Sequence, residues 1–140
     1  MRILGIDYGD ARIGLALSDA SATLCGRAWT LTEWNLDRAV DAIADVVRTE
    51  GVERIVLGYP KNMNNTEGER CEKTKEFAQM LERRTGLSVV LWDERLTTVA
   101  ADRHMMESGI RRENRKQYVD EIAAVFILQG YLDSLAFQKH

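Results

Sequence analysis

Residues 1–19 read MRILGIDYGDARIGLALSD, and this stretch decides the fold. In an extended chain successive side chains alternate between two faces, so Ile3, Gly5 and Asp7 share one face of a strand over residues 2–8. Gly9 and Asp10 are typical turn residues. Residues 13–18 alternate again, which predicts a second strand and a β-hairpin. Asp7 therefore ends an apolar strand, among residues too small to crowd its carboxylate.

A carboxylate at this position has two interpretations. Burying an unpaired charge costs several kcal/mol, so Asp7 needs a metal ion, a basic side chain or a raised pKa. Alternatively, Asp7 only closes the hairpin through an Asx turn. This stretch alone leaves both interpretations open.

Length and composition limit the class of protein. The chain has 140 residues, 45% of them apolar and 29% charged, which is ordinary for one soluble domain spanning residues 1–140. Its apolar runs are shorter than the roughly 18 residues that cross a bilayer, and its start lacks a signal-peptide pattern. We therefore expect a cytoplasmic protein without membrane contact. Cys25 and Cys71 lack CxxC spacing and are expected to be ordinary thiols.

Positive charge is concentrated in one segment. The net charge of −3 argues against a surface coated by nucleic acid. Residues 108–117, SGIRRENRKQ, nevertheless hold four basic residues against one glutamate: Arg111, Arg112, Arg115 and Lys116. We expect this basic loop to position a nucleic acid through its phosphates. The alternative is a solvated loop that serves solubility.

The pattern along the chain predicts a mixed α/β sheet. Strands are expected over residues 2–8, 13–18, 23–32, 52–59 and 87–92, and helices over 36–50, 69–85, 97–106 and 119–136. Asn35 is a suitable N-cap, and Gly51 and Gly86 are suitable helix ends. The order implies five strands, three in an antiparallel meander plus two parallel ones, with helices on both faces.

Acidic residues are expected to converge at one edge of this sheet. Sites in such sheets form at the carboxyl ends of parallel strands, where Asp7, Asp93 and Glu94 fall. The small residues 123–124 would let the last helix approach and carry Asp120 toward Asp7. Simpler alternatives exist: Asp120 favours a helix N-terminus, and Asp93 with Glu94 forms a solvated loop.

Clustered carboxylates favour one kind of chemistry. They repel one another unless divalent cations neutralise them, and Mg²⁺ prefers oxygen ligands. Two such ions about 4 Å apart activate water and stabilise the leaving oxygen of a phosphodiester. Phosphodiester hydrolysis is the reaction that fits.

Four segments, in order GIDYGDARIGLALSD, GYPKNMNNTEG, WDERLTT and VDEIAAVFIL, resemble the YqgF/RuvX family. That family is described as nucleases of pre-16S ribosomal RNA and, earlier, as Holliday junction resolvases. The resemblance implies an RNase H-like fold and a nuclease that uses Mg²⁺ or Mn²⁺ to process the 5′ end of pre-16S rRNA in ribosome biogenesis. It also implies that Asp7, Glu94 and Asp120 are the catalytic metal ligands, with Asp93 as second choice.

The chain departs from the usual family pattern near the expected substrate contacts. Asn65 stands where many relatives have glycine, and Val119 and Glu121 flank the last-helix acid. Asn65 belongs to a polar loop over residues 61–68. We expect Asn62, Asn64 and Thr66 of this loop to donate hydrogen bonds to the sugar-phosphate backbone of a nucleic acid.

Three alternatives to the RNA nuclease stay open. A branched-DNA resolvase would need two active sites and hence a dimer. An actin-like ATP-binding module would need two such domains. A non-catalytic RNA-binding or ribosome-associated protein would fit the modest charge. The expected partners are pre-rRNA or branched DNA, and the ribosome or its precursors, for a monomer or weak homodimer.

Overall fold

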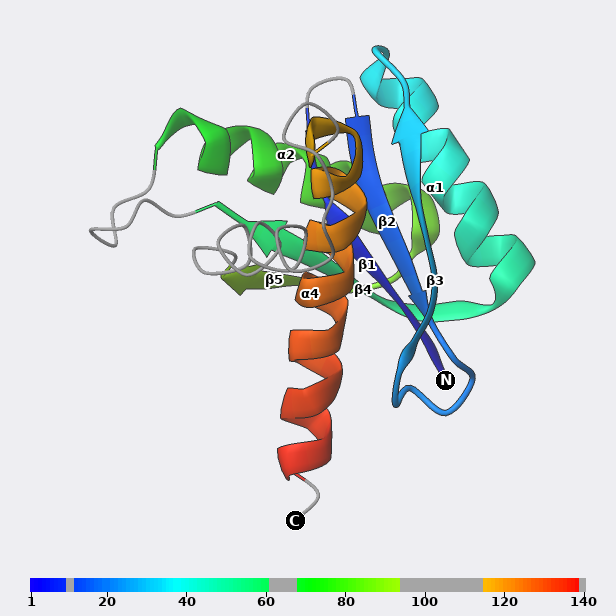
Figure 1. Ribbon diagram of the computed structural model, residues 1–140. Coiled ribbons are helices and arrows are strands. Elements are labelled where there is room, and N and C mark those ends of the chain that lie inside the picture. The colour runs from blue at the N-terminus through cyan, green and yellow to red at the C-terminus, as the bar shows by residue number, and fades with distance from the viewer. Residues whose placement is uncertain (10–11, 61–67, 94–114, 139–140) are drawn as a thin grey trace.

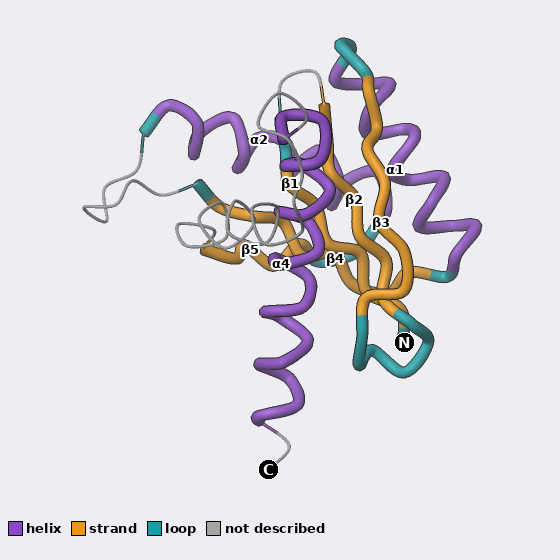
Figure 2. Tube along the Cα trace, in the orientation of Figure 1, coloured by secondary structure: helices purple, strands orange, loops and turns teal. Residues whose placement is uncertain are grey.

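The computed structural model describes residues 1–9, 12–60, 68–93 and 115–138, with the side chains of residues 115–120 and 137–138 left out. Figures 1 and 2 show one curved sheet with helices on both sides. The elements, in chain order, are β1 (Arg2–Asp7), β2 (Arg12–Ser18), β3 (Cys25–Thr32), α1 (Leu36–Glu50), β4 (Val52–Tyr59), α2 (Glu69–Thr85), β5 (Val89–Asp93) and α4 (Arg115–Gln138).

The five strands form a mixed sheet in the order β3-β2-β1-β4-β5. β1 and β2 pair antiparallel, as do β2 and β3, whereas β1 pairs parallel with β4 and β4 parallel with β5. The predicted meander with two added parallel strands is therefore confirmed.

Alternation along β1 divides the core into two layers. Leu4 and Ile6 belong to a buried cluster that includes side chains of α1 and α2. Ile3 belongs to a second cluster, which includes Ala124 and Leu128 of α4. Burying each large aliphatic side chain contributes about 1.5–3 kcal/mol, so both layers hold the sheet in place. The predicted assignment of faces is confirmed.

Local signals fix the helix ends. The side chain of Asn35 accepts the backbone N–H of Arg38 at 3.0 Å, which caps α1. α1 ends at Gly51 and α2 at Gly86, with φ angles of 66° and 74° in the left-handed region. Among the described residues, no helix has the length and apolar character needed to cross a membrane.

The starts of three elements differ from the prediction by two residues or more. β3 begins at Cys25 instead of residue 23, because the N–H groups of Thr23 and Leu24 bind the Asp19 carboxylate rather than the sheet. β5 begins at Val89 instead of residue 87. α4 begins at Arg115, four residues earlier than predicted, since good helix formers precede Val119. The helix predicted over residues 97–106 lies outside the described residues.

Candidate functional site

Asp7 is the last residue of β1 and is half-buried. It pairs with Gly14 of β2, and extending the register of Ile6 and Leu57 by one residue brings it level with Gly58 of β4. Gly58 lies on the α4 side of the sheet, two residues after Val56 of the α4 cluster. Since neither neighbour has a Cβ atom, the positions beside the Asp7 carboxylate are unobstructed by their side chains.

Three contacts fix the direction of α4 across the sheet. Thr30, which pairs with Gly14, donates its hydroxyl to the Glu121 carboxylate at 3.2 Å. At the opposite end of the sheet, the Cys25 N–H donates to Gln129 Oε1 at 3.2 Å. There too, Arg54 Nη1 donates to the Tyr131 hydroxyl at 2.7 Å. α4 therefore starts at the level of Asp7 and runs back toward the start of β1. Figure 1 shows α4 and β1 running in opposite directions.

α4 approaches β1 closely at Gly5. A Cβ atom at Gly5 would lie 2.7 Å from Leu128 Cβ and 3.2 Å from the Ala124 carbonyl oxygen. Only glycine allows this approach. Asp120 lies one helical turn before Ala124, so the backbone of α4 brings position 120 to the end of the sheet where β1 ends at Asp7.

Asp93 occupies a different face. Trp92 packs edge-on against Tyr131 of α4, with ring centroids 5.9 Å apart. Because side chains alternate, Asp93 lies on the other face of β5, where it is exposed. Glu94 follows it directly in the chain and lies outside the described residues.

The other predicted site residues divide into two groups. Asn62, Asn64, Thr66, Arg111 and Arg112 lie outside the described residues. Arg115 and Lys116 belong to the first turn of α4 rather than to a loop, and their side chains, like that of Asp120, are outside the description. Within the described part of the chain, no three His, Cys, Asp or Glu side chains come together as a metal-ligand set.

Arg70 is a residue beside the site that the sequence reasoning missed. Its Nη2 donates to the carbonyl oxygen of Tyr8, the residue after Asp7, at 2.5 Å. Its Cζ lies 5.3 Å from the centre of the Tyr8 ring, which stacks on the buried Phe77 at 4.3 Å. α2 thereby holds the chain immediately after Asp7. The only sequence signal was a basic residue in the first turn of α2, next to the polar loop.

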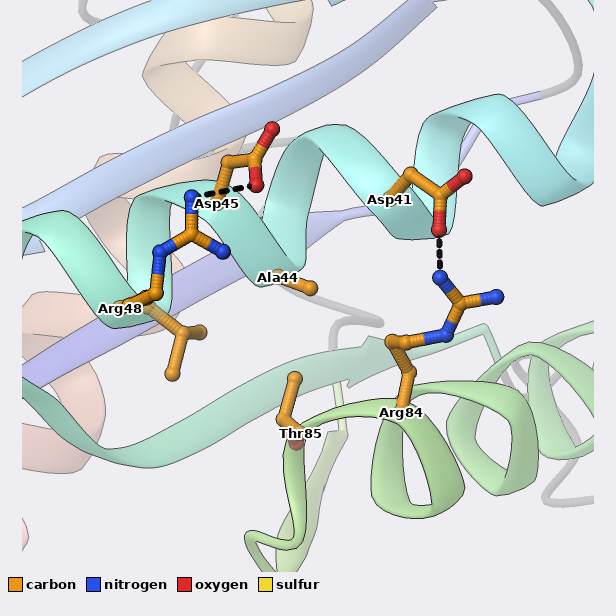
Figure 3. A pocket seen from close by; sticks show the side chains of 7 residues that line it. Asp41, Ala44, Asp45, Arg48, Arg84 and Thr85 are labelled. Carbon is orange, nitrogen blue, oxygen red and sulfur yellow. Dashed lines mark hydrogen bonds and ion pairs between the residues drawn. The ribbon is translucent and has the colours of Figure 1, made fainter.

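A hollow between α1 and α2 lies away from Asp7. It has a volume of about 590 Å³, and four of its lining residues are charged (Figure 3). Arg84 pairs with Asp41, and Arg48 Nη2 lies 2.9 Å from Asp45 Oδ1. Since these charges pair with one another, the hollow has no excess charge to bind a phosphate.

Sequence comparison places the chain among known proteins. A model of the RuvX family, described as "Holliday junction resolvase", matches residues 1–134. A protein of Agathobacter rectalis named "Putative pre-16S rRNA nuclease" is 60% identical over 139 residues, covering 97% of each chain. A protein of Acetivibrio thermocellus with the same name is 51% identical over 137 residues, covering 96% of each.

Structure comparison supports the fold. RuvC of Thermus thermophilus, solved in complex with a Holliday junction substrate, matches with a TM-score of 0.63 and 13% identity, covering 98% of this chain and 96% of that one. A fowlpox virus resolvase solved with Holliday junction DNA gives a TM-score of 0.60 and 12% identity, covering 96% and 99%. The fold is RNase H-like, as predicted. By the match to its family model and by these close relatives, the chain belongs to the RuvX family.

Proposed function

We propose that this protein is a divalent-metal-dependent endonuclease that cleaves structured RNA, with the 5′ end of pre-16S rRNA as its substrate. The observation that carries the proposal is the arrangement at the end of β1, where Asp7 lies between two glycines and level with the start of α4. The names of the close relatives support the choice of RNA.

The donor chemistry at this edge fits a hard cation. Asp7 offers carboxylate oxygens, and neither Gly14 nor Gly58 places a side chain beside them. In the proposal, Asp7, Glu94 and Asp120 hold one or two Mg²⁺ or Mn²⁺ ions. Asp93 is the less suited second choice, because it lies on the opposite face of β5 from Trp92.

The proposal gives the bound ion, Asp7 and Arg70 different roles. A bound divalent ion would supply Lewis-acid activation of the attacking water and offset charge on the phosphate. Asp7 would supply carboxylate oxygens to the ion from the end of a buried strand. Arg70 holds the Tyr8 carbonyl and thereby fixes the backbone that carries Asp7.

In the proposal, the substrate contacts come from the polar loop over residues 61–68 and from the basic residues before and at the start of α4. We assign phosphate contacts to the basic residues Arg111, Arg112, Arg115 and Lys116, and backbone contacts to Asn62, Asn64 and Thr66. Replacing Arg111 and Arg112 by Glu should weaken RNA binding and flatten its salt dependence, because fewer counterions are then released. An unchanged salt titration would remove these two residues from the interface.

One assay separates the proposed function from its competitors. Purified protein is incubated with a pre-16S rRNA fragment or a four-way DNA junction, in Mg²⁺ or in EDTA. Mg²⁺-dependent cleavage of the RNA at defined sites supports the proposal. Cleavage of the junction alone supports a resolvase, which the family description and the RuvC-like fold favour as second candidate. Binding without cleavage in any metal supports a non-catalytic adaptor.

The proposal has consequences for the cell. The protein would work in the cytoplasm, associate with ribosome precursors, and act as a monomer or weak homodimer. A resolvase would instead require two active sites in one dimer. Sedimentation of the protein bound to RNA measures whether it is a monomer or a dimer. It therefore distinguishes the nuclease from the resolvase without a cleavage assay.

A further inference from the structure

Trp34 differs from the other two tryptophans of the chain. Its side chain is 81% exposed. Trp29 packs against the buried cluster under α1 and α2, with Arg27 Cζ 4.5 Å from its ring centre. Trp92 packs against Tyr131. Exposing a large aromatic ring gives up a favourable burial that the other two obtain, so Trp34 has no packing role that accounts for it.

The turn that carries Trp34 is held firmly on both sides. The Asn35 N–H donates to the Glu33 carboxylate at 3.1 Å, and the Asn35 side chain caps α1. The Asn35 carbonyl accepts the first helical bond, from the N–H of Ala39, at 3.0 Å. The ring is therefore presented from a fixed backbone between β3 and α1.

Trp34 lies at the same end of the sheet as Asp7. Asp7 of β1 pairs with Gly14 of β2, and Gly14 pairs with Thr30 of β3, so Thr30 is level with Asp7 two strands away. Trp34 lies four residues after Thr30 in the chain. With strands about 4.8 Å apart and at most about 3.4 Å per residue, the two backbones are within about 17 Å. Figure 1 shows the β3–α1 turn and the start of α4 at the same end of the molecule. At about 3.4 Å per stacked nucleotide, this span corresponds to roughly five nucleotides.

The surrounding charge favours a base over a phosphate. Glu33 precedes Trp34, and Asp37 and Arg38 follow it in the first turn of α1, while Arg12 of β2 lies opposite Thr32 at the end of β3. Because two acidic and two basic residues balance, they give a phosphate no net attraction, whereas the exposed face of the indole is available to a neutral base. Aromatic side chains stack unpaired bases with little sequence preference.

We propose that Trp34 is a base-stacking site, which holds an unpaired nucleotide of the substrate a few positions from the scissile phosphate. The inference rests on the proposed function, because it takes the substrate to be a nucleic acid. It assigns the β3–α1 turn to the recognition of single-stranded segments beside the cleaved bond.

Binding measured without cleavage tests the inference. Single-stranded RNA of about ten nucleotides is titrated in EDTA against the wild type, W34F and W34A, followed by fluorescence anisotropy of the labelled RNA. W34A should bind about 5- to 100-fold more weakly, and W34F should keep most of the affinity because a smaller ring still stacks. The matched control is L24A, since Leu24 is 61% exposed at the opposite end of the sheet and should leave the affinity unchanged.

Tryptophan emission gives a second readout. Stacking should quench emission of the wild type, and W34F should lose that change while Trp29 and Trp92 remain. If W34A has an unchanged Tm and binds the RNA as tightly as the wild type, the inference is overturned. Contact with a protein partner would then be the remaining explanation for the exposed ring. If the RNA is bound through Trp34 but never cleaved in Mg²⁺, the stacking site stands and the nuclease proposal fails.

Discussion

An aspartate lies at each end of the β-sheet, and the two differ in which parts of the chain surround them. Asp19 follows β2 at one end, and its carboxylate accepts the N–H groups of Thr23 at 2.9 Å and Leu24 at 3.3 Å and the hydroxyl of Ser21 at 3.0 Å. These partners all come from its own loop. Hydrogen bonds from Thr23, and then from Leu24 and Ser21, hold the pKa of Asp19 below its ordinary value.

Asp7, at the other end, has surroundings assembled from distant parts of the chain. Gly14, Gly58 and the start of α4 come from three separate elements. An acid whose partners are local contributes to the stability of its loop. An acid set among remote elements depends on the whole fold, which is what a reaction site requires.

The largest expected effect concerns Asp7 itself. Asp7→Asn should lower RNA cleavage on the order of 10³-fold, about 4 kcal/mol of transition-state stabilisation, because the amide cannot hold a divalent ion as a carboxylate does. Cleavage rates in Mg²⁺ and the Tm of both proteins measure this. Asp19→Asn is the control and should cleave normally. Equal cleavage by the Asp7 variant would refute the assignment of the site.

The next effect concerns the contact between β1 and α4. Gly5→Ala should destabilise the protein by about 1–3 kcal/mol, because the added methyl group would overlap Leu128 Cβ and force the helix outward. Urea unfolding measures the change. Gly26→Ala is the matched control, since the nearest atom to its added methyl group would be the Leu17 carbonyl oxygen at 3.7 Å. Equal stability of the two variants would contradict the close approach of α4.

A smaller effect concerns Arg70, near Asp7, and Arg54, at the opposite end of the sheet. Arg70→Met should lower kcat about 10-fold with little change in KM. The reason is that loss of a group that orients a metal ligand without contacting the metal typically lowers activity about 10–100-fold. Arg54→Met removes the bond to the Tyr131 hydroxyl at the other end and should change stability but not kcat. If both variants cleave at the wild-type rate, Arg70 has no part in positioning Asp7.

The smallest effect is the pH dependence of the Asp19 loop. A carboxylate whose pKa is lowered by folding contributes stability above its ordinary pKa and loses it as the pH falls through the folded value. Asp19→Ala should therefore lower the Tm slightly at pH 7, and the difference should shrink as the pH falls below about 4. Thermal scans across this range measure it. A Tm difference that stays constant with pH would mean that the carboxylate charge has no role.

The sequence predicted the parts of the fold that depend on near neighbours. Alternation in β1 gave the two faces of the sheet, and Asn35, Gly51 and Gly86 gave the helix ends, because these signals act within one or two turns. The start of β3 was wrong by two residues, since the competition of Asp19 for the N–H groups of Thr23 and Leu24 depends on the folded loop.

The candidate site was predictable only in part. The place of Asp7 at the end of a strand followed from the alternating pattern of the hairpin, and the approach of the last helix followed from its small residues. The contact of Arg70 with the Tyr8 carbonyl joins residues 62 positions apart and leaves no periodic signal. The place of Asp93 on the opposite face depends on where β5 starts and on the packing of Trp92. The role of Glu94 stays a prediction.

The way α4 is attached has a consequence for how such a protein can diversify. Among the described residues, the sheet contacts α4 through Gly5, Cys25, Thr30 and Arg54, and the helix residues that they contact all lie after residue 120. Changes of length or composition in residues 94–114 should therefore leave these contacts intact, and with them the place of position 120 at the end of the sheet.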